Sequence, residues 1–166
     1  DALFELCRFH STGVDERTSL AGYVERMKDG QDAIYYLVGE GAPATLAGAP
    51  QLEGFRAKGV EVLLLTDPID AFWTAAVGEA LGKPLKSASQ AGDALDSVAD
   101  AEKAEDAKAE ETPPAPGLDA LTAALKLALR EDVADIRVSR RLQESPVCLV
   151  AAEGGLDMGA ERILRR

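Results

Sequence analysis

Two carboxylates stand directly after the most apolar segment of the chain and are well placed for chemistry. The segment 59–70 reads GVEVLLLTDPID, so Asp67 and Asp70 follow a run of residues typical of a buried strand. Acids at the carboxyl end of a parallel strand can bind Mg²⁺ or act as nucleophiles. The same residues fit a helix start, because Asp67 can cap backbone N–H groups and Pro68 suits the first helical position. Capping is the favoured interpretation, and a small α/β metal-dependent enzyme using Asp67 and Asp70 is the alternative.

Other residue types that carry chemistry are few and widely spaced. His10 is the single histidine, and no cysteine pair lies near it with the spacing of a metal site. Cys7 and Cys148 are far apart in the sequence, which favours reduced thiols over a structural disulfide. The glycine-rich segments 39–48 and 153–162 lack the phosphate-binding and dinucleotide-binding spacings, so we interpret both as turns.

A pair of adjacent aromatic residues follows the two acids. Phe72 and Trp73 fall in the first turn of a predicted helix, where consecutive side chains diverge by about 100°. If one of them packs inward, the other points toward solvent, and an exposed aromatic beside apolar surface suggests a contact site. Burial of both by neighbouring loops is the alternative.

The order of strand-like and helix-like patterns predicts an α/β fold. The predicted elements are a helix at 19–28 capped by Ser19, a strand at 33–38, a short helix at 44–47, a helix at 51–58, a strand at 60–65, a helix from 68 to about 81, and an extra strand or a departing strap at 83–89. This β-α-β-α order predicts a right-handed crossover and a small α-β-α layer with a short, mostly parallel sheet.

The composition changes after this layer. Residues 93–111 hold eight acids against two lysines, and their apolar residues are mostly alanine, which predicts a solvated helical linker. The segment TPPAPG at 112–117 ends that helix. The whole chain carries a formal charge of −11, which argues against nucleic-acid and anionic-membrane partners.

A second, small α+β unit is predicted from Leu118 onward. Leucines continue along one helical stripe from that residue, and strands are predicted at 135–140, with Ile136 and Val138 inward, and at 147–151. A unit of about 50 residues has a marginal core, so we expect it to lean on other structure.

A predicted amphipathic helix at 156–164 closes this unit. Met158, Ile163 and Leu164 form its apolar stripe, which is interpreted either as core or as an adaptable contact patch.

Four segments together resemble a known family. They are FHST at 9–12, YVERMKDGQDAIYYLVGE at 23–40, GVEVLLLTDPID at 59–70 and VSRRLQESPVCLV at 138–150. Their wording, order and spacing resemble the heat-shock protein 90 chaperone family, most closely its bacterial form, over nearly the whole chain.

The resemblance implies how the chain is organised. Residues 1–90 look like the end of the family's middle domain, 91–117 like an acidic helical linker, and 118–166 like the first part of its carboxyl-terminal domain. The family's ATP-binding domain and its dimerisation helices would lie outside this stretch, so the chain is expected to be an excised fragment. It would be no enzyme itself and hold no cofactor, whereas the parent protein would be a cytoplasmic homodimer that uses ATP and Mg²⁺. The fragment is expected to be monomeric or weakly associating.

The resemblance also implies partners, namely unfolded or partly folded client proteins. The implied client-binding residues are Phe72, Trp73, Met158, Ile163 and Leu164. A purely structural connector is the competing interpretation, and it predicts that both apolar sets are fully buried.

Overall fold

The structure is a computed structural model that describes residues 2–90, 95, 117–139 and 141–151. Among these, the residues up to 95 and those from 142 onward form one compact unit, and those from 117 to 141 form another. The domain boundaries implied by the family resemblance stay a prediction.

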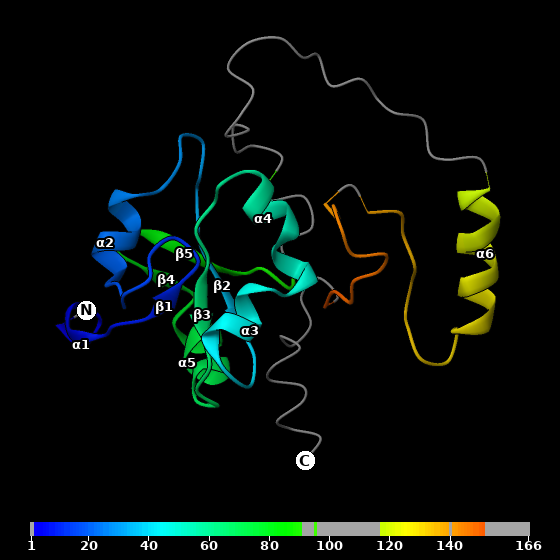
Figure 1. Cartoon of the computed structure of the whole chain (residues 1–166). Coiled ribbons are helices and arrows are strands. Elements are labelled where there is room, and N and C mark those ends of the chain that lie inside the picture. Colours follow the sequence, from blue (N-terminus) through cyan, green and yellow to red (C-terminus); the bar gives the residue numbers. More distant parts are fainter. Residues whose placement is uncertain (1, 91–94, 96–116, 140, 152–166) are drawn as a thin grey trace, which may run out of the picture. The chain divides into compact units, whose positions relative to one another are not determined.

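Within the described residues the first unit contains a five-stranded sheet with the order β1-β3-β2-β5-β4 (Figure 1). The strands are β1 (His10–Ser11), β2 (Ile34–Val38), β3 (Leu63–Leu65), β4 (Glu79–Ala80) and β5 (Lys83–Ser87). The central strands β3, β2 and β5 are parallel, whereas β1 and β4 add antiparallel edges. The predicted α/β class and the short, mostly parallel sheet are confirmed.

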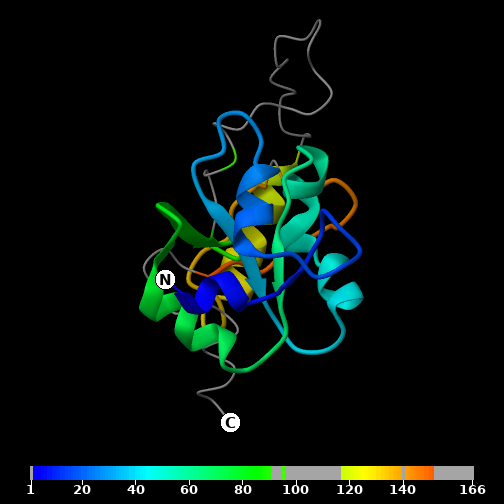
Figure 2. The same cartoon turned by 90° about the vertical axis from the view of Figure 1, so that its left-hand side faces the viewer.

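Helices cover both faces of this sheet. They are α1 (Ala2–Leu6), α2 (Leu20–Glu25), α3 (Pro43–Ala47), the 3₁₀ turn η1 (Pro50–Leu52), α4 (Glu53–Ala57) and α5 (Asp70–Val77). Figures 1 and 2 show α3 and α4 on the face opposite α1 and α2. The predicted cap of α2 is confirmed, because the Ser19 hydroxyl accepts the Gly22 N–H at 3.1 Å.

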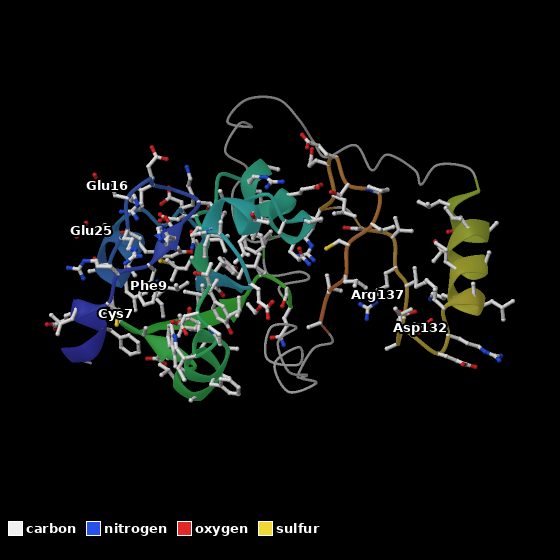
Figure 3. The ribbon with its side chains drawn as sticks, turned by 60° about the horizontal axis from the view of Figure 1, so that its bottom comes forward. Cys7, Phe9, Glu16, Glu25, Asp132 and Arg137 are labelled. Carbon is white, nitrogen blue, oxygen red and sulfur yellow. The ribbon has the colours of Figure 1, made fainter. Side chains whose placement is uncertain are left out.

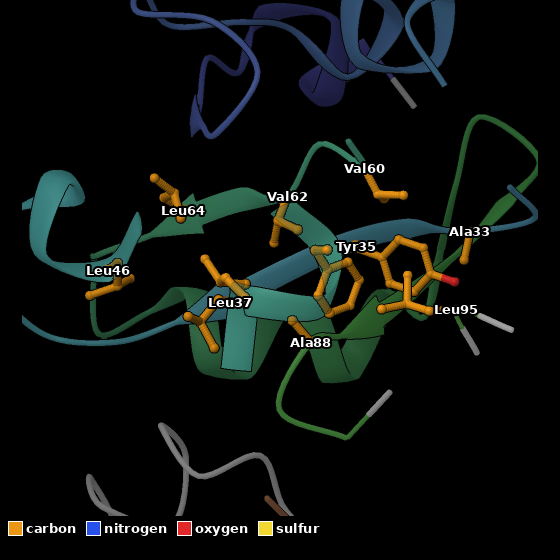
Figure 4. Packing of buried hydrophobic residues seen from close by; sticks show 11 residues of the cluster. Ala33, Tyr35, Leu37, Leu46, Val60, Val62, Leu64, Ala88 and Leu95 are labelled. Atoms are coloured by element: carbon orange, nitrogen blue, oxygen red, sulfur yellow. The ribbon is translucent and has the colours of Figure 1, made fainter. Parts of the chain in front are cut away.

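Alternation along β2 explains the two helical layers, since successive side chains of a strand point to opposite faces. One face carries the α4-side cluster, which comprises Ala33, Tyr35, Leu37, Leu46, Leu52, Phe55, Val60, Val62, Leu64, Ala88 and Leu95 (Figure 4). The other carries the α2-side cluster of Leu20, Tyr23, Ile34, Tyr36, Leu63, Leu65 and Ala80. Tyr35 meets the ring of Phe55 edge-on at 4.9 Å between centroids. β2 is therefore buried on both faces, as a central strand of a covered sheet must be.

A buried hydroxyl joins α2 to the sheet. Tyr23 Oη donates to the Glu61 carbonyl at 2.6 Å and accepts the Tyr35 N–H at 3.0 Å and Gln31 Nε2 at 3.0 Å. Burial raises the pKa of Tyr23 well above its ordinary value. Arg26 then pairs with both Glu61 carboxylate oxygens, at 2.8 and 2.9 Å. These contacts satisfy polar groups that the packing of α2 would otherwise leave buried and unpaired.

The predicted helix from 68 to about 81 is too long. α5 ends at Val77, because Gly78 adopts a left-handed φ of 67° and turns the chain. A tight turn at Leu81 and Gly82, with φ of 52° and 71°, then folds β4 back onto β5. Sequence reasoning missed this hairpin because its first strand is only two residues long.

The described part of the second unit contains the helix α6 (Leu118–Ala128) and no strand. Lys126 Nζ lies 2.7 Å from an oxygen of Asp135, which ties the end of α6 to the chain that follows. The strand predicted at 135–140 is wrong for the residues described there, since Val138 is exposed and none of the described strands pairs with this segment. None of the described helices is long and apolar enough to cross a bilayer.

The strand predicted at 147–151 is also wrong. These residues belong to the first unit and form no ladder with a described strand. The predicted helix at 156–164 lies outside the described residues, as does the acidic linker at 93–111 apart from Leu95.

We predict that Tyr23→Phe lowers the free energy of unfolding by about 1–3 kcal/mol, because the Tyr35 N–H and the Gln31 amide lose their acceptor. Urea unfolding at neutral pH measures the change. Phe72→Leu is the control, since a substitution at this exposed position should stay within about 0.5 kcal/mol. An unchanged stability of Tyr23→Phe would contradict the role assigned to the hydroxyl.

Candidate contact surface on α5

The loop after β3 uses both predicted acids to begin α5. Asp67 Oδ1 accepts the Ile69 N–H at 3.1 Å, and Asp70 Oδ2 accepts the Asp67 N–H at 3.1 Å. These two bonds satisfy backbone donors of the turn that leads into α5. The capping interpretation holds only in part. Both acids bind N–H groups of the turn before α5, but the helix begins at Asp70 and not at Pro68, and its N-cap residue Ile69 makes no side-chain cap bond.

The metal-dependent enzyme finds no support in this geometry. The other oxygen of Asp70 accepts the indole N–H of Trp73 at 2.6 Å, so this carboxylate already has two partners. Across residues 2–90, 95, 117–139 and 141–151, no group of three or more His, Cys, Asp or Glu side chains is placed to hold a metal ion. Asp67 and Asp70 are therefore explained by the helix start.

Trp73 is the aromatic residue that turns inward. Its ring lies 5.7 Å from that of Phe4 and 5.9 Å from that of Phe9, measured between centroids, and it packs against the α2-side cluster (Phe9 is labelled in Figure 3). The bond from its indole N–H to Asp70 fixes the orientation of the ring. Trp73 is therefore partly buried and firmly placed.

Phe72 is the aromatic residue that turns outward. Its side chain is 43% exposed, and Ile69, one helical turn earlier, is 62% exposed. Residues three apart share one face of a helix, so these two present an apolar surface. The predicted divergence of the two aromatics is confirmed. Sequence reasoning did not select Ile69, although its spacing from Phe72 was a usable signal.

The structure brings Phe72 and Trp73 together on a single helix. Met158, Ile163 and Leu164 lie outside the described residues, so their place beside this surface stays a prediction.

A buried carboxylate at the start of α4 was not predicted from the sequence. Glu53, the first residue of α4, is only 4% exposed, and its carboxylate accepts the N–H groups of Gln143, Glu144 and Ser145 at 2.6, 3.0 and 3.1 Å. Hydrogen bonding by Ser145, and then by the N–H groups of Glu144 and Gln143, lowers the pKa of Glu53 to about 2. No local sequence pattern indicates this contact, because its donors come 90 residues later in the chain.

The fold and α5 together define a small α/β protein with an apolar surface presented beside its sheet. The whole chain, residues 1–166, matches the sequence profile of the family described as "Hsp90 protein". It is similar to "Chaperone protein HtpG" of Roseobacter denitrificans, with 52% identity over 166 residues that cover 100% of this chain and 26% of the relative. The HtpG of Paramagnetospirillum magneticum is 56% identical over 163 residues, which cover 98% of this chain and 26% of the relative.

The chain therefore belongs to the Hsp90 family of chaperones. It spans 26% of the length of these two relatives.

The hydrogen bonds of Glu53 predict how the free energy of unfolding depends on pH. Its pKa is about 2 in the folded chain against an ordinary 4.5, so the unfolded chain binds the proton more tightly. The stability that this carboxylate contributes is fully present above about pH 4.5 and is lost as the pH falls toward 2. We expect the difference in free energy of unfolding between the wild type and Glu53→Gln to be largest near pH 6 and to shrink toward pH 2.

Denaturant unfolding across this pH range measures the difference. Glu144→Gln is the matched control, because it removes an exposed carboxylate but keeps the backbone N–H that binds Glu53. It should retain the wild-type pH profile. A difference between the wild type and Glu53→Gln that does not vary with pH would contradict the assignment.

Proposed function

We propose that the chain supplies client-binding surface to an ATP-dependent molecular chaperone. The observation that carries the proposal is the exposed apolar surface formed by Phe72 on α5 and by Ile69 directly before it, in a chain of the Hsp90 family. Unfolded or partly folded proteins expose apolar side chains, and transient burial of these against such a face is favourable. The net charge of −11 keeps a protein with open apolar surface soluble.

In this proposal the two aromatics of α5 have different roles. Phe72 offers the accessible ring that a client covers, and Trp73 provides a rigid support, since it is held by Asp70 and packed against Phe9. A rigid support lowers the entropy that binding must overcome. Met158, Ile163 and Leu164 would extend the same surface from the predicted helix at 156–164.

The proposal includes the finer features that the family resemblance implies. The whole protein would be a cytoplasmic homodimer driven by ATP. The present stretch would relay rearrangements between its middle and carboxyl-terminal domains, while the fragment alone would stay monomeric or weakly associating. A purely structural connector is the competing function, and the exposure of Phe72 argues against it because that function requires full burial of this set.

Suppression of client aggregation tests the proposal directly. The 166-residue chain should slow the aggregation of a partly unfolded model protein, and Phe72→Ser should weaken that effect by roughly tenfold in the concentration required. The size follows from the roughly 1.5–3 kcal/mol that complete burial of such a side chain contributes, of which a partly exposed ring supplies a fraction. Trp73→Ser and Met158→Ser test the remaining positions.

Leu127→Ser is the control, because it removes an exposed leucine from α6 in the second unit. Its activity should equal that of the wild type. Emission from Trp73, the single tryptophan, verifies that Phe72→Ser leaves the packing of α5 intact. Full activity of Phe72→Ser, Trp73→Ser and Met158→Ser would overturn the assigned surface.

A further inference from the structure

Residues 142–151, here called the strap, lie on the first unit without forming a helix or a strand. The strap is the orange segment beside α4 in Figure 1. Its firmest attachment is Glu53, whose carboxylate receives the N–H groups of Gln143, Glu144 and Ser145. Three successive backbone donors thus converge on a single acceptor.

Such a row of N–H groups forms a concave site for an anion. Hydrogen bonds to a charged acceptor are roughly twice as strong as those between neutral groups. Because one carboxylate serves all three donors, its loss would release them together. Glutamine cannot replace it, since its neutral amide offers one weaker acceptor and turns an NH₂ group toward the same donors.

Two further attachments are single, neutral hydrogen bonds near the far end of the strap. Gln51 Nε2 donates to the Leu149 carbonyl at 3.2 Å, and the Ala151 N–H donates to the Ser89 carbonyl at 3.0 Å. A typical neutral bond contributes less to stability than a bond to a charged group. The Glu53 contact is therefore the strongest of these three attachments.

Three of the apolar side chains of the strap are largely exposed, and Leu142 and Cys148 are half-buried. Val147, Leu149 and Val150 are 70%, 67% and 53% exposed. No residue of the strap, all of which the structure describes, belongs to the α4-side or the α2-side cluster. The strap can therefore leave the α/β layer without opening either cluster.

We propose that the strap docks on the α/β layer and releases from it as one unit, and that the Glu53 carboxylate is the group that holds it in the docked state. In the docked state the carboxylate binds the three N–H groups of residues 143–145. In the released state water hydrates both partners, and the sheet with its helices stays folded. The inference rests on the strap's own geometry and does not depend on client binding.

Hydrogen exchange resolved by residue, measured on the 166-residue chain at neutral pH, tests whether Glu53 holds the strap. In Glu53→Gln, the amides of Gln143, Glu144 and Ser145 should exchange at least about tenfold faster than in the wild type. The amides of Tyr35 and Leu37 in β2 should keep their wild-type rates. Glu144→Gln removes the same charge from the strap itself and should change neither set.

Three results would overturn the proposal. One is unchanged exchange at residues 143–145 in Glu53→Gln, which would show that the carboxylate does not hold the strap. Another is an equal acceleration at β2, which would show that strap and layer open together. The third concerns Gln51→Ala, which removes the hydrogen bond to Leu149. It should accelerate amide exchange at residues 143–145 less than Glu53→Gln does. An equal or larger effect would show that Glu53 is not the main attachment.

Discussion

The burial of β2 on both faces is the constraint on which the rest of the first unit depends. Tyr35 faces the α4-side cluster and Ile34 faces the α2-side cluster, so helices must cover both sides of the sheet. The chain between two of the parallel strands must then pass from a strand end into a covering helix. The β3–α5 connection does this through Asp67 and Asp70, and it thereby determines where α5 presents its apolar face.

Those parts of the fold that depend on local sequence were predictable. The strand formers at 33–38 and the Asp-Pro pair after β3 act over a few residues. The strand is confirmed, and a helix follows the Asp-Pro pair, although it begins at Asp70 and not at Pro68. The two-residue strands β1 and β4 were not predictable, because so short a segment has no periodicity and is defined only by its pairing. The strand predicted at 135–140 fails for a related reason, since alternation along a chain cannot supply the partner that a strand requires.

The candidate surface on α5 likewise combines features that local sequence predicts with features that only long-range contacts determine. The roughly 100° between neighbours on a helix predicts that Phe72 and Trp73 diverge, but not which of them turns inward. Contacts with Phe4 and Phe9, more than sixty residues earlier in the sequence, decide in favour of Trp73. Glu53 is the extreme case, because its donors are distant in sequence and are backbone groups without a residue signature. The two features of most functional interest thus arise from long-range contacts on a predictable framework.

In the proposed function, α5 presents the surface that contacts clients. Titration of the isotopically labelled 166-residue chain with an unfolded client protein, followed by amide chemical shifts, tests it most directly. We expect the largest shifts within residues 2–90 to fall in the segment 69–76, around Phe72. Client binding that shifts amides elsewhere in the chain and leaves the segment 69–76 unchanged would contradict a client-binding role of α5.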